Sequence, residues 1–255
     1  MTLATVGGNR HGSEVTEFHT LPDGRRIAFR QAAGSGPAIV FLPGYKSDMA
    51  GSKATALFEW CELTGRACLL FDYSGCGESP GDFAEGTLSR WAEEAVAIIE
   101  ARLGGPVILA GSSMGGWLML LAADRLGSRV AALVGIAAAP DFTDWGYDTR
   151  QKARLASGET LLLDNPYGPE PTPVHPAFWS DGEANRQLDG EIPFAGPVRL
   201  VHGQDDGDVP VEVSLRLAAA LRSQDVQVTL VKGGDHRLSR EQDIALLLRT
   251  VADLS

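Results

Sequence analysis

The chain has 255 residues, of which 44% are hydrophobic and 22% are charged, and its formal net charge is −11. This composition is typical of a soluble globular protein and disfavours a disordered or membrane-embedded chain. The acidic balance also disfavours nucleic acid and anionic membranes as partners, because both repel a negative surface. The chain has no internal repeat and no proline- or serine-rich linker, which favours one domain with an insertion.

The cysteines and the N-terminal stretch bear on the compartment. The chain has three cysteines, Cys61, Cys68 and Cys76. An odd number cannot all form disulfides within the chain, and their spacing fits no zinc site, so we expect free thiols in a reducing compartment. The N-terminal stretch lacks the apolar core of a signal peptide, and no run approaches the roughly 18 apolar residues of a spanning helix. We therefore expect a cytoplasmic protein without a membrane span, with a flexible tail over residues 1–12 and one domain over 13–255.

The first half of the chain alternates between strand and helix patterns. Residues 14–21 and 25–32 flank the turn Pro-Asp-Gly and predict a β-hairpin. The apolar runs 37–44, 67–75, 106–113 and 130–140 predict buried strands. Helical spacing over 52–65, 87–105 and 114–127 predicts the helices between them, with Gly65 ending the first and Gly104 closing the second.

The alternation stops at residue 141 and returns near 197. Residues 197–203 and 226–234 predict strands, and residues 212–223 and 241–254 predict helices. Such alternation indicates an α/β fold with a mostly parallel, eight-stranded sheet and helices on both faces. In these sheets, ligands bind beyond the carboxyl ends of the strands. The segment 141–195, with one expected helix near 148–156, reads as a small cap inserted into the domain.

A nucleophile is predicted where the strand over 106–113 meets the next helix. Gly111-Ser112-Ser113-Met114-Gly115 matches the pattern G-x-S-x-G between a strand and a helix, which is the context that this motif requires. Ser113 stands at the sharp turn and is the expected nucleophile. Ser112 precedes the turn and is assigned a structural role.

A serine hydroxyl needs a base, and an acid must orient that base. Three histidines follow Ser113, namely His175, His202 and His236; we expect His236 to be the base, because it follows the last strand on a glycine-rich loop. The spacing H-G-x-x-D-x-x-V-P selects Asp206 as the acid, with Asp205 as the alternative. Asp208 is expected to be a solvated loop residue, and Asp235 lies in the same loop as His236 and is less able to face its ring.

An oxyanion site should be formed by two backbone N–H groups. The N–H of Met114 lies at the helix start, and the N–H of Tyr45 follows Gly44 in the first strand–helix loop. The stretch 71–82 contains glycines but no phosphate-binding fingerprint. It is interpreted as a tight turn in which Asp72, Ser74 and Ser79 bind backbone groups. No metal-ligand cluster and no cofactor motif accompany these residues.

In its strand order and in Ser113, Asp206 and His236, the chain resembles the α/β-hydrolase superfamily. The stretches "FLPGYKSDMAGSKA", "FDYSGCGESPGDF", "GSSMGGWLMLLAA", "VRLVHGQDDGDVP" and "GGDHRLSR" resemble the subfamily of α/β-hydrolase domain-containing protein ten. Its animal members are described as mitochondrial acyl-protein thioesterases and acyl-glucuronide esterases. The resemblance implies hydrolysis of acyl esters or thioesters without a metal or organic cofactor. Because the chain lacks an organelle-targeting leader, we expect a bacterial member.

The cap is expected to shape the substrate site, because it carries six aromatic residues. They are Phe142, Trp145, Tyr147, Tyr167, Phe178 and Trp179, and we expect two or three to touch a ligand, with Trp145, Tyr147, Phe178 and Trp179 as candidates. The alternative is that they only pack the cap onto the domain. Two other functions stay open: another reaction on the same fold, such as C–C bond hydrolysis or perhydrolysis, and ligand binding without catalysis.

Overall fold

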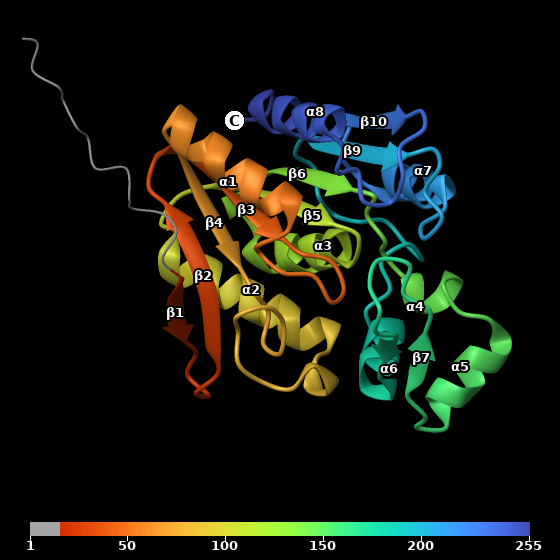
Figure 1. The fold of residues 1–255 in the computed structure, drawn as a ribbon. Helices are drawn as coiled ribbons and strands as arrows, with labels where there is room; N and C mark the ends of the chain where they lie inside the picture. Colours follow the sequence, from red (N-terminus) through yellow and green to blue (C-terminus); the bar gives the residue numbers. More distant parts are fainter. Residues whose placement is uncertain (1–15) are drawn as a thin grey trace, which may run out of the picture.

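The structure is a computed structural model that describes residues 16–255, so the tail expected over residues 1–12 lies outside the described part. Its centre is an eight-stranded sheet with the order β1-β2-β4-β3-β5-β6-β9-β10 (Figure 1). The strands are β1 (Glu17–Thr20), β2 (Arg26–Ala32), β3 (Ser35–Leu42), β4 (Arg66–Phe71), β5 (Val107–Ser112), β6 (Val130–Ile136), β9 (Val198–Gly203) and β10 (Val226–Val231). β1–β2 and β2–β4 pair antiparallel, and the other pairs are parallel. The predicted fold class is confirmed.

Helices cover both faces of this sheet. The helices are α1 (Ser52–Thr64), α2 (Leu88–Arg102), α3 (Met114–Leu126), α7 (Val211–Ala220) and α8 (Glu241–Ala252). α1 and α8 contribute apolar side chains to one buried cluster, and α2 and α3 contribute to a second cluster that also holds Leu217 of α7. The central strands are therefore buried on both sides, which explains their continuous apolar runs.

Two predicted helix ends were wrong, those of α2 and of α7, which ends at Ala220 instead of residue 223 because Leu221 is extended and buried. α1 ends at Gly65 as expected, with a left-handed φ of 68°. α2 begins after Thr87, whose Oγ1 accepts the N–H of Arg90, but it ends at Arg102. Leu103 is already extended, and its side chain is buried in the core. The burial of Leu103 turns the chain away from the helix, so Gly104 lies beyond the end instead of closing it.

Between β6 and β9, the chain forms a separate group of small elements, which we call the cap (residues 141–195). It contains α4 (Phe142–Trp145), α5 (Thr149–Ala156), β7 (Leu161–Leu163), β8 (Thr172–Val174) and α6 (Pro176–Ala184). The expected helix near 148–156 is α5, which starts with a capping box at Asp148. Figure 1 shows these elements on one side of the molecule, where β5 and β6 end. The short helices η1 (Phe83–Glu85) and η2 (Gly127–Arg129) lie outside the cap.

Asp141 ties the two ends of the cap together. Its backbone has a φ of 59°, and its side chain is almost completely buried. The two carboxylate oxygens accept the N–H groups of Gln187 and Leu188, each at 2.7 Å. The segment that leaves the sheet is thus held beside the segment that returns to it.

Candidate active site

Ser113 occupies a strained turn between β5 and α3. Its φ of 54° and ψ of −121° are rarely adopted by a residue with a side chain. The surrounding backbone holds it there, because its N–H donates to Ile136 O at 3.0 Å and its C=O accepts the N–H groups of Gly116 and Ala139. Ser113 is half-buried, whereas Ser112 is buried in β5. Both serines line the cavity described below, but Ser113 is the more exposed of the two.

The glycines around Ser113 are explained by close approach of the helix to the sheet. A Cβ on Gly115 would lie 2.0 Å from Leu42 O, and one on Gly111 would lie 2.3 Å from Gly115 O. A Cβ on Gly116 would lie 2.4 Å from the Cβ of Ala138. Any side chain at these positions would push α3 away from the strands and displace Ser113.

The structure brings Ser113, His236 and Asp206 into one hydrogen-bonded chain. His236 Nε2 lies 3.1 Å from Ser113 Oγ, and His236 Nδ1 lies 2.9 Å from Asp206 Oδ2. Because an ionised carboxylate only accepts hydrogen bonds, Nδ1 carries the proton and Nε2 is free to accept one from Ser113. These residues come from the ends of β5, β9 and β10, which meet at the same edge of the sheet.

The Asp206 carboxylate is buried and fully hydrogen-bonded. Its side chain is 0% exposed, and its Oδ1 accepts the N–H groups of Asp208 and Val209 at 2.9 and 2.8 Å. Burial opposes ionisation, but contacts with His202 and His236 outweigh it and hold the pKa of Asp206 below its usual range. The carboxylate therefore stays charged beside His236 throughout the neutral range.

The other acidic and histidine candidates are placed elsewhere. Asp205 is exposed, Asp208 accepts the hydroxyl of Tyr167 at 2.6 Å, and Asp235 accepts the N–H of Leu238. His175 lies in the cap, 3.3 Å from Thr160 Oγ1. His202 is fully buried behind Asp206, with its Nε2 3.2 Å from Asp206 Oδ2. None of these side chains contacts Ser113 Oγ within hydrogen-bond distance.

The two expected oxyanion donors flank the turn at Ser113. Gly44 passes close to Ser113, because a Cβ on Gly44 would lie 3.3 Å from the Cβ of Ser113. The N–H groups of Tyr45 and Met114 donate no hydrogen bond to another residue of the described range 16–255. Met114 is also the first residue of α3, where the helix dipole favours negative charge. Both groups are thus unengaged within residues 16–255, as the predicted oxyanion role requires.

The β4–α2 loop is a tight turn in which Asp72 and Ser79 bind backbone groups, as predicted, but the same prediction for Ser74 was wrong, because its hydroxyl binds a buried carboxylate. Asp72 is buried and accepts the N–H groups of Met49 and Glu78 at 2.7 and 2.8 Å. Ser79 Oγ accepts the N–H of Ala28 at 2.8 Å. Ser74 is bound by its N–H and its hydroxyl to the buried Glu94. Asp72 thereby fixes the far end of the loop that contains Tyr45.

A cavity of about 550 Å³ opens over Ser113 and His236. Of the four aromatic residues proposed to bind substrate, only Trp145 lines it, together with Phe142 and Tyr167. Phe178 is 1% exposed and packs in the main core, and Tyr147 and Trp179 pack in the small core of the cap. The geometry therefore favours Phe142, Trp145 and Tyr167 as contacts for a ligand.

The charged groups around this cavity balance one another. Lys46, Lys53 and Arg237 line it together with Asp48, Asp164 and Asp208. Lys53 donates a hydrogen bond to Arg237 O at 2.5 Å, and burial, with a smaller contribution from Arg237, lowers its pKa to about 8. Nothing in the sequence singles out Lys53, because it lies within an ordinary helical pattern. Its position follows from the packing of α1 against the loop that contains His236.

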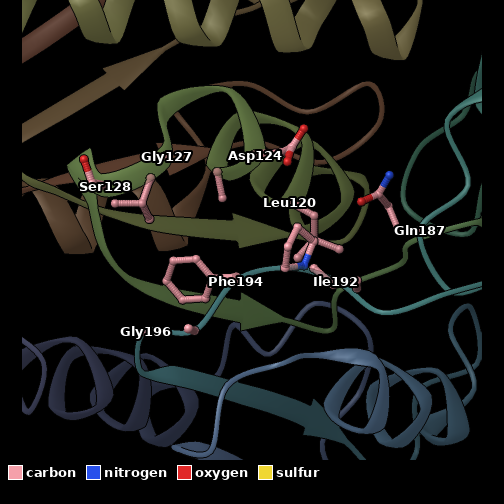
Figure 2. Close-up of a pocket in the computed structure, with 12 residues that line it drawn as sticks. Leu120, Asp124, Gly127, Ser128, Gln187, Ile192, Phe194 and Gly196 are labelled. Atoms are coloured by element: carbon pink, nitrogen blue, oxygen red, sulfur yellow. The ribbon is translucent and has the colours of Figure 1, made fainter.

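A second cavity, of about 430 Å³, lies away from these residues (Figure 2). Figure 2 shows Leu120 and Asp124 of α3 opposite Ile192 and Phe194, which belong to the segment leading into β9. None of the predicted site residues lines it. Within residues 16–255, no group of three or more His, Cys, Asp or Glu side chains is arranged to hold a metal ion, and no helix has the length and apolarity to span a membrane.

Comparison with known proteins agrees with this geometry. Residues 39–250 match the model of the alpha/beta hydrolase family. The human protein named palmitoyl-protein thioesterase ABHD10, mitochondrial, is 38% identical over 243 residues, which are 93% of this chain and 79% of the human one. The solved structure of mouse alpha/beta hydrolase domain-containing protein 10 has 37% identity and a TM-score of 0.88, with 94% of this chain and 98% of that chain covered.

A solved putative hydrolase from Agrobacterium vitis S4 is similar to the same degree. Its identity is 38% and its TM-score is 0.87, with 94% of this chain and 99% of that chain covered. The family match over residues 39–250 spans Ser113, Asp206 and His236. The chain therefore belongs to the alpha/beta hydrolase family, and the predicted resemblance to the ABHD10 proteins is confirmed.

Proposed function

We propose that this protein hydrolyses carboxylic esters or thioesters of acyl substrates, with Ser113 as nucleophile, His236 as general base and acid, and Asp206 as the residue that orients His236. The observation that carries the proposal is the continuous chain from Ser113 Oγ through His236 to Asp206, at 3.1 and 2.9 Å, on the floor of an open cavity. A serine hydroxyl in this arrangement is activated by proton transfer to the imidazole.

The reaction proceeds in two halves. Ser113 Oγ attacks the carbonyl carbon while His236 Nε2 takes the hydroxyl proton, and the resulting oxyanion is bound by the N–H groups of Tyr45 and Met114. Collapse of this intermediate breaks the bond to the leaving oxygen or sulfur, which receives the proton from His236, and leaves an acyl ester on Ser113. Water then attacks the acyl ester with the same proton transfers and releases the carboxylic acid.

The acyl group would lie against the aromatic part of the cavity. Phe142, Trp145 and Tyr167 provide apolar surface beside Ser113. Apolar surface with a few polar groups is what acyl ligands require. The ABHD10 relatives are named palmitoyl-protein thioesterases, which supports acyl thioesters as a substrate class for this chain.

Substitution of Ser113 tests the proposal. Ser113→Ala should lower kcat for p-nitrophenyl and acyl-thioester substrates by about 10⁴-fold or more and leave the fold intact, because only binding and oxyanion contacts remain. Ser112→Ala is the matched control, since Ser112 is a neighbouring serine whose side chain is buried in the sheet. A Ser113→Ala enzyme with a tenth of the original kcat would contradict the assignment and favour ligand binding or other chemistry.

We also propose that the protein works in a reducing compartment such as the cytoplasm. This rests on its three cysteines, all of which are buried free thiols. Fractionation of the source cells with an antibody against the chain tests this, and recovery from an oxidising compartment would contradict it.

A further inference from the structure

A second histidine, His202, lies directly behind the carboxylate of Asp206. His202 is the fifth residue of β9 and is 0% exposed. Its Nε2 lies 2.9 Å from Val209 O and 3.2 Å from Asp206 Oδ2. Its Nδ1 lies 2.7 Å from the hydroxyl of Ser214 in α7, and Ser214 is only 1% exposed. A buried imidazole is unfavourable unless its polar atoms are paired, and here both nitrogens are.

These contacts fix the protonation of the ring. The two oxygens near Nε2 are a peptide carbonyl and a carboxylate, and neither can donate a hydrogen bond. Nε2 therefore carries a proton. In the neutral ring, Nδ1 is then an acceptor, and the hydroxyl of Ser214 is the donor that faces it. Val209 O and the Asp206 carboxylate thus impose the tautomer with N–H on Nε2, and the Ser214 hydroxyl satisfies the remaining Nδ1 acceptor.

We propose that His202 is a positioning residue for Asp206 and that Ser214 supports it by donating a hydrogen bond to its Nδ1; this inference rests on the proposed function of Ser113, His236 and Asp206. The connection runs through the turn over residues 206–209. His202 Nε2–H holds the carbonyl of Val209, and the N–H of Val209 donates to Asp206 Oδ1 at 2.8 Å.

His202 also contacts the second carboxylate oxygen of Asp206, Oδ2. The N–H edge of His202 lies against Oδ2, which is also the oxygen that accepts from His236 Nδ1 at 2.9 Å. The carboxylate is therefore held between two imidazoles and two backbone N–H groups and cannot rotate away from His236. An apolar residue at position 202 would leave Val209 O and Ser214 Oγ buried without these partners and would free the carboxylate to turn.

Two substitutions of His202 separate positioning from simple packing. His202→Phe keeps a planar ring and removes both nitrogens, whereas His202→Gln keeps a side-chain N–H. With a p-nitrophenyl ester, we expect His202→Phe to lower kcat about 10- to 100-fold with KM changed less than about threefold, because displacement of a catalytic group by an ångström has effects of this size. We expect His202→Gln to recover a measurable part of the lost kcat.

Substitution of Ser214 provides a second test of the inference, and it has a matched control. Ser214→Ala should lower kcat several-fold, since His202 Nδ1 loses the hydroxyl that pairs with it and holds the ring in place. Ser223→Ala removes another buried serine, whose hydroxyl donates to Gly196 O at 2.6 Å, and it should leave kcat unchanged. If His202→Phe does not fold, His202→Gln and the two serine variants carry the same test.

A double-mutant cycle decides whether His202 acts through Asp206. In an Asp206→Asn background, His202→Phe should cause no further loss of kcat, because the carboxylate that it positions is gone. Either wild-type kcat in folded His202→Phe or an undiminished loss in the Asp206→Asn background would overturn the inference. Failure of the wild-type enzyme to hydrolyse any ester or thioester, or to react with a fluorophosphonate, would instead overturn the proposed function on which the inference rests.

Discussion

Tyr45 donates a hydrogen bond from its phenolic oxygen to the carbonyl oxygen of Pro173, at 2.9 Å. Tyr45 follows Gly44 in the loop over the nucleophile, and Pro173 lies in strand β8 of the cap. The Tyr45 ring also packs against Phe142 and Phe178 of the cap, with ring centroids 6.2 and 4.7 Å apart. One residue thus joins the proposed oxyanion site to the cap that covers the cavity.

Removal of this hydroxyl should loosen the cap. Tyr45→Phe keeps the ring and leaves Pro173 O without its donor, which should destabilise the docked cap by about 1 kcal/mol. We expect faster amide exchange in β7 and β8, and a reduction of kcat/KM of about threefold to tenfold. Tyr73→Phe is the matched control, because it also removes a hydroxyl bound to a proline carbonyl, that of Pro43, but touches no cap strand. If amide hydrogen exchange in β7 and β8 is as slow in Tyr45→Phe as in wild type, the Tyr45 hydroxyl does not hold the cap in place.

The three aspartates of the loop after β9 should differ strongly in their effect on catalysis. Asp206→Asn should lower kcat by about 10⁴-fold, because the amide cannot hold the imidazole in the required tautomer. Asp205→Asn should change kcat less than about threefold, since Asp205 is exposed, and Asp208→Asn should act mainly through its contact with Tyr167. Steady-state kinetics on the three purified variants checks this. A loss in Asp205→Asn as large as that in Asp206→Asn would show that the acid had been misassigned.

The close approach of α3 to the sheet predicts a sharp contrast between two glycines. Gly115→Ala would place a Cβ 2.0 Å from Leu42 O, and we expect a loss of at least about 3 kcal/mol in the free energy of unfolding or no folded protein. Gly104→Ala meets nothing within 4 Å and should change that free energy by less than about 0.5 kcal/mol. Denaturant unfolding of both variants provides the comparison, and equal stabilities would refute the packing described for the nucleophile turn.

Lys53 gives the protein a pH-dependent stability. Burial lowers its pKa to about 8 from the ordinary 10.5, so the folded state binds fewer protons than the unfolded state between these values. The cost of charging Lys53 is fully present below pH 8 and disappears as the pH rises toward 10.5. Lys53→Met removes this cost. Its stability relative to wild type should therefore decrease by about 2 kcal/mol between pH 7 and pH 9.5, measured by denaturant unfolding. A difference that does not change with pH would contradict the proposed burial of the charge.

The sequence predicted the central sheet and the Ser113–His236–Asp206 chain because both depend on local signals. Each of these residues follows an apolar strand in a short motif, and the ends of parallel strands meet at one edge of the sheet. The sheet therefore brings together residues that are 123 and 30 positions apart. The same motif contains Gly111 and Gly115, whose lack of a side chain lets α3 lie close to the sheet.

The cap was harder to predict, because its elements are short and contain prolines. β7 and β8 have three residues each, with Pro173 inside β8, and α6 starts at Pro176. No periodicity can be recognised over so few residues. The direction of each aromatic side chain depends on how the cap docks, which is why Phe178 is in the core whereas Trp145 lines the cavity.

His202 shows a different limit of sequence reasoning. Its place at the end of β9 was predicted, and its spacing from Asp206 was used to select the acid. Its contacts with Asp206, Val209 and Ser214 depend on how the loop after β9 folds back against α7. The spacing His202-Gly203-x-x-Asp206 was the available signal, but the partners became evident only in three dimensions.

The most direct test of the account is to find the residue that becomes covalently modified. The protein is incubated with a fluorophosphonate, digested, and mapped by tandem mass spectrometry. We expect one modified residue, Ser113, in wild type, with Ser112 unmodified and labelling abolished in Ser113→Ala. Modification at another residue, or hydrolytic activity that persists in a protein fully resistant to the fluorophosphonate, would contradict the assignment of Ser113 as the nucleophile.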